Sequence, residues 1–371
     1  MYLKTRFHLI TLLALFAISS YAQNTVPFDT TNWNVQGNFH QFTVYQGQQA
    51  LTLEGAVAQL KGVEFQDGIV EWDMAFTPNR GFSGLRFRMI DEANSEEFYL
   101  RPHQSGNPDA NQYCPVDNTL ASWQLYHGEA YSAVINYPFH EWFHVKMVIS
   151  GSRAEVYIKD MDKPLLHIPE LKHTPTAGGL YLYAARTPVY FANFSYQAMD
   201  NNPPKLVNPA PEAALPDPAT IKQWEVSQGF HESELDGITD LSDWNMDMSW
   251  QTLQTEVSGL GNIATVTPFQ RETSNTVFVR YTIDATQKHT KALQFGFSDR
   301  ARVFLNGQLM FSGNDGFRTR DYRYLGTIGY HDTVYLPLKK GKNELWIAVS
   351  ENFGGWAIQG RWIDLEGITT Q

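Results

Sequence analysis

The sequence predicts an all-β protein with two β-sandwich (jelly-roll) domains joined by a proline-rich linker. Short runs of β-branched and aromatic residues recur between Gly, Pro, Asn and Asp, as in sandwich strands and their turns. Aromatic residues make up 14% of the chain and charged residues only 18%. Six prolines fall within residues 200–220, where neither a helix nor a regular strand ladder can continue.

The first 22 residues have the pattern of a secretory signal peptide. Basic residues precede an apolar run over residues 9–18, and small residues at 20 and 22 form a cleavage signature. The run is too short for a membrane anchor, no cysteine follows it to carry a lipid, and no later segment is apolar enough to span a bilayer. We expect a secreted or periplasmic protein without a membrane span, cleaved after Ala22.

Charge and cysteine content restrict the function classes. The net charge of -11 argues against a nucleic-acid partner, because phosphate binding needs a basic surface. The single cysteine, Cys114, cannot form an internal disulfide, and we expect it to be a small buried residue rather than a nucleophile. The hydrophobic cores must therefore stand without cross-links, which two domains of this size can do.

The proline-rich segment sets the expected domain bounds. Residues 24–199 form the first domain, residues 200–218 a semi-rigid extended linker, and residues 219–371 the second domain. The strands expected in the first domain are 68–76, 84–90, 97–103, 122–127, 142–150, 153–160, 178–185 and 189–197. Those expected in the second are 276–284, 292–299, 301–313, 332–338 and 343–351, with a hairpin turn at Asn306-Gly307.

Two resemblances follow from these segments. The stretches "FQDGIVEWDM", "GFSGLRFRM", "EEFYLRPHQSG" and "EWFHVKMVISGSRAEVYI" resemble concanavalin A-like lectin/glucanase sandwiches, including laminin G-like and 3-keto-disaccharide hydrolase-like domains, over nearly all of residues 26–198. The stretches "SDRARVFLNGQLMFSG" and "GKNELWIAVSENFGGW" resemble the galactose-binding-like sandwich over residues 276–356. The resemblance implies work on carbohydrates. A structural Ca²⁺ ion is compatible with both folds, although no Asp-rich loop specifies one.

The residues of one strand test whether the chain carries the catalytic motif of glucanases. Retaining glucanases on this fold carry Glu-x-Asp-x-x-Glu, and Glu71 and Asp73 match the first two positions. The third position is Phe76, which also has the opposite strand parity. Retaining chemistry needs two carboxyl groups about 5 Å apart, so the sequence argues against this type of enzyme.

A polar face around residues 96–106 carries the candidate binding site. Tyr99, Arg101 and His103 alternate with apolar neighbours and share one side of an extended chain. Planar polar groups among aromatic rings are typical of small-molecule pockets and match the hydroxyl pairs and C–H patches of sugars. The candidate ligand-binding residues are Arg86, Arg88, Tyr99, Arg101, His103, Gln112, Tyr113, Gln124, Arg320 and Trp356.

Two interpretations of the arginines remain open. If 68–76 and 84–90 form a hairpin, Glu71 and Asp73 face Arg86 and Arg88 in a charge ladder worth about 0.2–1 kcal/mol per pair. If the arginines instead converge with Arg101, they favour an acidic group on the ligand, because guanidinium pairs with carboxylate or sulfate. In the second domain, Trp356 either stacks on a sugar or closes the edge of the sandwich.

The sequence thus favours a secreted carbohydrate-binding protein in glycan recognition or breakdown. One alternative is a glycoside-cleaving enzyme of the 3-keto-disaccharide hydrolase type, with His103, His127, Glu71 and Asp73 as candidate proton carriers. A second alternative is a structural or adhesion protein whose arginine-rich faces meet a protein partner. No zinc-type spacing, P-loop, dinucleotide-binding glycine pattern or G-x-S-x-G elbow occurs, so no cofactor beyond Ca²⁺ is expected.

Overall fold

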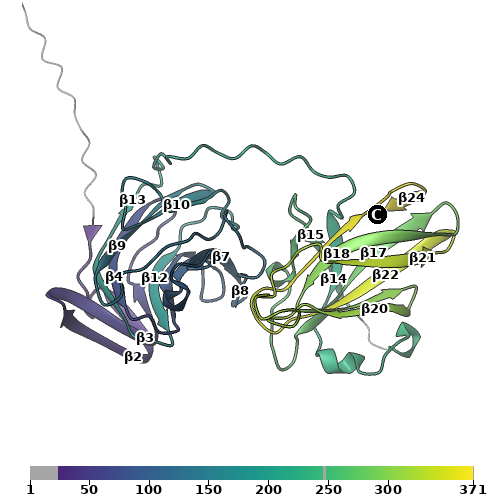
Figure 1. Cartoon of the computed structure of the whole chain (residues 1–371), viewed down its shortest axis with the longest axis horizontal. Coiled ribbons are helices and arrows are strands. Elements are labelled where there is room, and N and C mark those ends of the chain that lie inside the picture. Colours follow the sequence, from purple (N-terminus) through teal and green to yellow (C-terminus); the bar gives the residue numbers. More distant parts are fainter. Residues whose placement is uncertain (1–23, 245–247, 371) are drawn as a thin grey trace, which may run out of the picture.

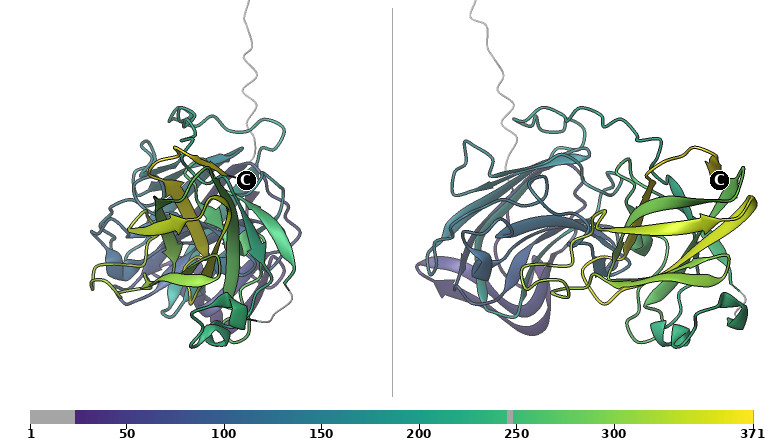
Figure 2. Two further views of the ribbon diagram at one scale, coloured as in Figure 1. Left: turned by 90° about the vertical axis from the view of Figure 1, so that its right-hand side faces the viewer. Right: turned by 45° about the vertical axis from the view of Figure 1, so that its right-hand side comes forward.

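A computed structural model describes residues 24–244 and 248–370 (Figure 1). Its regular elements are antiparallel strands and a few short 3-10 turns, which confirms the predicted all-β class. The strands gather into two bodies that lie side by side, β1–β13 and β14–β24 (Figures 1 and 2). The predicted signal peptide lies outside the described residues. Within them, no helix has the length and apolar character needed to cross a membrane.

The first body, here called the first sandwich, is one long sheet folded on itself. Its strands are β1 (Asn24–Thr25), β2 (Trp33–Tyr45), β3 (Gln48–Leu60), β4 (Gly68–Phe76), β5 (Phe82–Met89), β6 (Ser95–Leu100), β7 (Asn111–Asp117), β8 (Leu120–Ala121), β9 (Phe143–Ser150), β10 (Arg153–Ile158), β11 (Leu166–Ile168), β12 (Gly179–Ala185) and β13 (Val189–Ala198). The main order is β11-β10-β9-β4-β13-β3-β12-β5-β6-β7-β8.

The fold in this sheet lies at the β2–β3 hairpin. Residues 50–53 of β3 pair with β13, whereas residues 56–59 pair with β12, so β3 belongs to both layers. The bend between them falls at Gly37 and Gly55, which have φ of 128° and 56°. A Cβ atom on Gly37 would lie 2.4 Å from the Gly55 carbonyl oxygen, so only glycine permits this approach. The main hydrophobic core lies between the two layers.

Strand pairing corrects one expectation. β4 pairs with β9 and β13, and β5 pairs with β6 and β12, so 68–76 and 84–90 do not form a hairpin. The apolar side chains of both strands point into the shared core, from opposite layers. The alternation of apolar and polar residues shows which face of a strand is buried, but not which strand lies beside it. Glu71 and Asp73 therefore lie opposite Lys146 and His144 of β9, and the proposed charge ladder with Arg86 and Arg88 does not exist.

The second body, here called the second sandwich, has two facing sheets. Its strands are β14 (Gln223–Ser227), β15 (Trp250–Gln254), β16 (Gly261–Asn262), β17 (Thr276–Ala285), β18 (His289–Ser298), β19 (Arg300–Leu305), β20 (Gln308–Asn314), β21 (Asp332–Leu338), β22 (Gly341–Ser350), β23 (Ala357–Trp362) and β24 (Ile368–Thr370). The orders are β15-β14-β17-β22-β19-β20, with β24 on β17, and β16-β23-β18-β21. The predicted hairpin turn is confirmed, with Asn306 and Gly307 at φ of 49° and 90° between β19 and β20.

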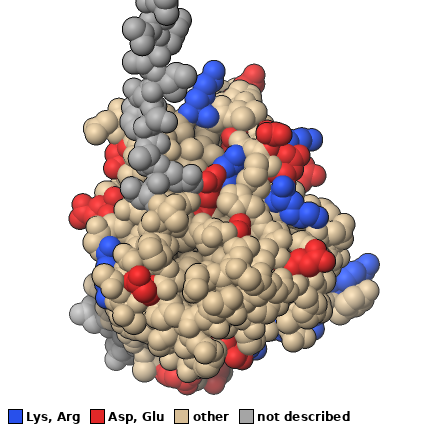
Figure 3. Space-filling view, turned by 90° about the vertical axis from the view of Figure 1, so that its left-hand side faces the viewer, with Lys and Arg blue, Asp and Glu red and all other residues tan. Residues whose placement is uncertain are grey.

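The proline-rich segment, residues 200–218, runs between the two sandwiches without a regular element (Figure 1). Its start is tied to the first sandwich, because the backbone N–H groups of Val207 and Asn208 donate to the buried Glu155 carboxylate at 3.0 and 2.6 Å. Cys114 is buried and unpaired, as expected, and burial raises the pKa of its thiol. The face shown in Figure 3 is largely uncharged, and its acidic and basic side chains lie mainly toward its edges.

Candidate functional site

A cavity of about 430 Å³ lies where the two sandwiches meet. β5, β6 and β12 of the first sandwich form one wall, and the loop 317–325 with Phe353 of the second forms the other. Its aromatic lining is Phe82, Tyr99, Trp123, Tyr183, Phe317 and Phe353. Its charged or titratable lining is Arg80, Glu97, Arg101, His103, Asp109, Arg186 and Arg318.

Arg101 lies at the centre of the first wall. β6 ends just before Arg101, because Pro102 has no N–H for the ladder. Continued alternation places the Arg101 side chain on the face of the sheet away from the core residues Phe98 and Leu100. Its buried guanidinium donates to the Asp109 carbonyl at 2.9 Å. It donates further to the Tyr99 hydroxyl and the Gln112 amide oxygen, each at 2.5 Å. No carboxylate in the described part of the chain forms an ion pair with it.

Gln112 holds the Arg101 side chain and the turn that carries Trp123 in place. Its amide nitrogen donates to the carbonyl oxygens of Trp123 and Tyr126 at 2.7 and 2.6 Å, which fixes the turn that carries Trp123. The Arg101 guanidinium lies over the Tyr99 ring at 4.7 Å and over the Trp123 ring at 5.8 Å. Burial raises the pKa of Tyr99 well above its usual value, so this phenol stays protonated. Gln112 is therefore a positioning residue rather than part of the cavity wall.

His103 completes the predicted face. It stands in the 3-10 turn Pro102–Gln104, and its ring packs edge-on against Phe82 at 5.4 Å between centroids. Burial and the nearby charges of Arg80 and Arg101 lower the pKa of His103, so its imidazole is neutral near pH 7. Tyr99, Arg101 and His103 all line the cavity. Alternation accounts for Tyr99 and Arg101, but the expected strand 97–103 ends at Leu100, and the 3-10 turn places His103.

An aromatic cluster joins the two walls. Trp123 of the first sandwich lies 6.4 Å from Phe317 and 6.0 Å from Phe353 of the second, between ring centroids. The two phenylalanine rings are 5.8 Å apart. Part of Phe353 stays exposed, so the cluster offers apolar ring surface to the cavity as well as contact between the sandwiches.

The segment 122–127 is a turn and not the predicted strand. Its Gln124 is buried between loops of the second sandwich, where its N–H donates to the Gly354 carbonyl and its amide donates to the Leu325 carbonyl, both at 2.7 Å. A Cβ atom on Gly354 or Gly326 would lie within 2.3 Å of that amide group. The strand prediction failed because Gln124 and Leu125 are buried against the second sandwich and not in a sheet of the first. Gln124 thus joins the sandwiches and does not line the cavity.

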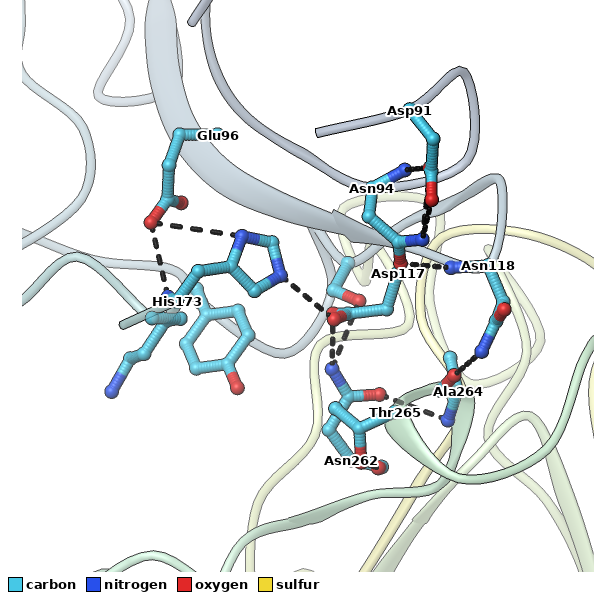
Figure 4. Close-up of polar contacts among 12 residues, drawn as sticks. Asp91, Asn94, Glu96, Asp117, Asn118, His173, Asn262, Ala264 and Thr265 are labelled. Carbon is cyan, nitrogen blue, oxygen red and sulfur yellow. Dashed lines mark hydrogen bonds and ion pairs between the residues drawn. The ribbon is translucent and has the colours of Figure 1, made fainter. Parts of the chain in front are cut away.

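A buried polar network forms a second junction (Figure 4). Asp117 accepts a hydrogen bond from Asn262 of the second sandwich at 2.9 Å and contacts the His173 ring at 2.8 Å. The His173 backbone N–H donates to Glu96 at 3.0 Å. Burial lowers the pKa of His173, but the bond to Asp117 and the charge of Glu96 outweigh it and raise that pKa overall. Polar groups that cross the junction hold the cavity walls in register.

The remaining arginine candidates do not converge. Arg86 lies on the cavity side of its sheet but pairs with Glu97 at 2.5 Å and lines an adjacent hollow of about 500 Å³. Arg88 has a φ of 51° and turns to the end of the sandwich, where it pairs with Asp67 at 3.1 Å. Arg320 pairs with two aspartates of its own sandwich, Asp315 and Asp332. Of these candidates only Arg101 lines the cavity.

Three further candidates lie elsewhere. Tyr113 faces the core and donates its hydroxyl to Glu96 at 2.7 Å, because its parity in β7 is opposite to that of Gln112. Trp356 is fully buried and donates to the Val349 carbonyl at 3.0 Å, so it closes the sandwich and offers no stacking surface. His127 is exposed and contacts the Ile328 carbonyl at 3.1 Å, outside the cavity.

Glu71 and Asp73 stand on the outer face of the other layer, with His144. The His144 Nδ1 contacts Asp73 at 2.7 Å, and hydrogen bonds to Asp73 and Glu71 raise the pKa of His144 to about 9. The cavity and this group occupy different layers of the sandwich, so these carboxylates do not act with His103.

This group predicts a pH dependence of stability. Because the folded-state pKa of His144 is about 9 and its unfolded value is about 6.5, its contribution is fully present below pH 6.5 and disappears as the pH rises through 9. The free energy of unfolding should fall more steeply over this window in the wild type than in His144→Gln. Urea titrations at several pH values measure it, and equal slopes for both proteins would contradict the assignment.

Several cavity residues were not among the sequence candidates. Arg318 lines the cavity, whereas the sequence candidate from the same loop, Arg320, does not. Arg80 and Arg186 follow from no sequence signal, because they come from turns far apart in the chain. Among the described residues, no group of three or more His, Cys, Asp or Glu side chains is placed to hold a metal ion.

Comparisons with known proteins add little to this geometry. A carbohydrate-binding module from Bacillus subtilis is 16% identical over 45% of this chain and 96% of its own, with a TM-score of 0.35. A β-glucanase from Bacillus licheniformis is 11% identical over 48% of this chain and 99% of its own, also with a TM-score of 0.35. No protein-family model matches the chain, and the search of curated proteins finds no match.

Proposed function

We propose that this chain is a secreted or periplasmic protein that binds a carbohydrate in the cavity between its two sandwiches. The single observation that carries the proposal is the cavity lining, in which rings from both sandwiches surround a buried arginine. Rings stack on the C–H faces of sugars, and a few fixed polar groups among apolar walls orient a small ligand. In this proposal, residues 24–199 and 219–371 are the two domains, of lectin/glucanase-like and galactose-binding-like type.

The cavity geometry fits a sugar in a specific way. Trp123, Phe317 and Phe353 offer ring surface at the junction, while Arg101 and Tyr99 present donors and acceptors whose positions are fixed by Gln112. Preorganised groups lose little conformational entropy when a ligand binds. Because both sandwiches supply the rings, binding requires the intact two-sandwich protein.

A glycoside-cleaving reaction is the second candidate, favoured by His103. A neutral imidazole inside the cavity has a proton-accepting nitrogen near pH 7, as a general base requires. The other three proton carriers expected from the sequence lie outside the cavity, so His103 is the one that remains. Calorimetry separates the candidates. Heat that saturates with a fixed stoichiometry indicates binding, whereas constant power after each injection indicates turnover and makes His103→Gln the next variant.

Replacing Trp123 with alanine should weaken glycan binding by up to about tenfold. Aromatic stacking contributes about 0.5–1.5 kcal/mol, and about 1.4 kcal/mol is a tenfold change in affinity. Calorimetry against a glycan that the wild type binds measures the effect. Trp142→Ala is the matched control, because Trp142 is also half-buried but lies against Tyr45, away from the cavity. Equal affinity for Trp123→Ala and the wild type would remove the cavity from the proposal.

A further inference from the structure

The cavity is positively charged although the protein is acidic. Four arginines line it, against two carboxylates, in a chain of net charge -11. One carboxylate, Glu97, is already paired with Arg86 at 2.5 Å, and the Tyr183 hydroxyl donates to it at 2.7 Å. Asp109 is the other, and its carbonyl rather than its carboxylate accepts from Arg101. The cavity therefore holds a positive charge that its own acidic groups do not balance.

Arg101 is the buried positive charge of this cavity. The residue is only 6% exposed, and the hydrogen-bond partners of its guanidinium are a carbonyl, a phenol and an amide, which are all neutral. A buried charge is costly unless an opposite charge compensates it. A guanidinium has five N–H donors, and the three hydrogen bonds leave two of them for an oxyanion.

Two rim arginines are held in an unfavourable backbone conformation. Arg186 of the first sandwich has a φ of 79°, and Arg318 of the second has a φ of 64°. Long side chains rarely adopt this left-handed region, and residues held there cluster at ligand sites. Both are exposed, and across residues 24–244 and 248–370 neither forms an ion pair with a carboxylate. They place like charges on facing walls of the same cavity.

We propose that the ligand is an acidic glycan whose carboxylate or sulfate group binds Arg101, with Arg186 and Arg318 closing on it from the two sandwiches. The inference rests on the proposed function and names its ligand class. An oxyanion at this position relieves the mutual repulsion of the arginines, so it binds both walls at once. A neutral sugar has no group that does so.

Calorimetry with matched ligand pairs tests the inference. Uronic acid trisaccharides are compared with their methyl esters, and sulfated disaccharides with their desulfated forms, so that the members of a pair differ only at the acidic group. We expect the acidic member of at least one pair to bind about tenfold more tightly, as charge-assisted hydrogen bonds do. This preference should shrink as the NaCl concentration rises from about 0.05 to 0.5 M. The pair that responds distinguishes carboxylate from sulfate.

The outcomes separate the two proposals. Equal binding of acidic and neutral members would overturn the acidic ligand but leave carbohydrate binding intact. No binding to any member would overturn both.

Two variants test the arginines without unfolding the protein. Asparagine tolerates the left-handed region better than arginine, so Arg186→Asn and Arg318→Asn should keep or raise the Tm. Each should reduce the acidic-over-neutral preference by about threefold to tenfold. Arg323→Asn is the matched control, because it removes a charge from the same loop at an exposed residue outside the cavity. An unchanged preference in both rim variants and in Arg101→Gln would overturn the inference.

Discussion

Replacing Trp356 with alanine is expected to lower the free energy of unfolding of the second sandwich by about 3–5 kcal/mol. The indole is fully buried in the second core, packs edge-on against Phe269 at 6.0 Å between centroids, and donates to the Val349 carbonyl. Truncation leaves a large cavity and removes the indole hydrogen bond at once, and both effects destabilise the folded state. Urea denaturation followed by circular dichroism measures the loss.

The matched variant is Trp123→Ala, which removes the same side chain from the cavity wall. Trp123 is only half-buried, and its side chain makes no hydrogen bond among the described residues. Trp123→Ala should therefore lower the free energy of unfolding less than Trp356→Ala does, and lower the glycan affinity more. The two tryptophans thus predict opposite phenotypes. A stable Trp356→Ala protein with weakened glycan binding would return Trp356 to the ligand surface and refute its assignment to the core.

Replacing Gly354 with alanine is expected to weaken the junction between the sandwiches by about 2–4 kcal/mol, combining overpacking with left-handed backbone strain. Gly354 has a φ of 104°, and a new Cβ atom would lie 2.3 Å from the Gln124 side-chain oxygen. The Gln124 amide must then leave its bond to the Leu325 carbonyl. We expect the two sandwiches to unfold in separate transitions and the glycan affinity to fall with the loss of the shared cavity.

Gly128→Ala provides the control for backbone strain. Gly128 also has a positive φ, of 85°, but no atom lies within 4 Å of the position that a Cβ atom would take, so alanine there adds strain without a clash. Limited proteolysis within residues 122–127 gives a second readout, since Gln124 and Leu125 are buried at the junction and become exposed when the sandwiches separate. If Gly354→Ala and Gly128→Ala behave alike, the clash with Gln124 is not what joins the sandwiches.

The fold class could be predicted from the sequence because it depends on local patterns. Alternation in β4 and the Asn306-Gly307 turn each specify their own geometry within a few residues. The partner of a strand is a different matter. Nothing in residues 68–76 shows that β4 pairs with β9 and not with β5. Pairing with β5 would place arginines opposite Asp73, but in the structure Asp73 lies opposite His144 of β9.

The candidate site divides along the same line. Tyr99 and Arg101 could be predicted because they alternate within one extended segment and take one face from it, whereas His103 reaches the cavity from the 3-10 turn that follows. Arg186 and Arg318 could not, because they become neighbours only when two bodies far apart in the sequence meet. Trp123 and Trp356 are alike in residue type and both follow turn residues, so only their burial tells a cavity wall from a core.

The insertion of Gln124 into the second sandwich has a consequence for biosynthesis. The residues that receive it, Leu325 and Gly354, are made about 200 or more positions later in the chain, as the interval of 201 between Gln124 and Leu325 shows. A growing chain can complete the first sandwich early, but its junction turn has no partner until residues 325–354 have been made. The cavity therefore depends on both sandwiches being encoded in one chain. A gene rearrangement that joined either sandwich to a different domain would keep the fold of that sandwich but lose the cavity.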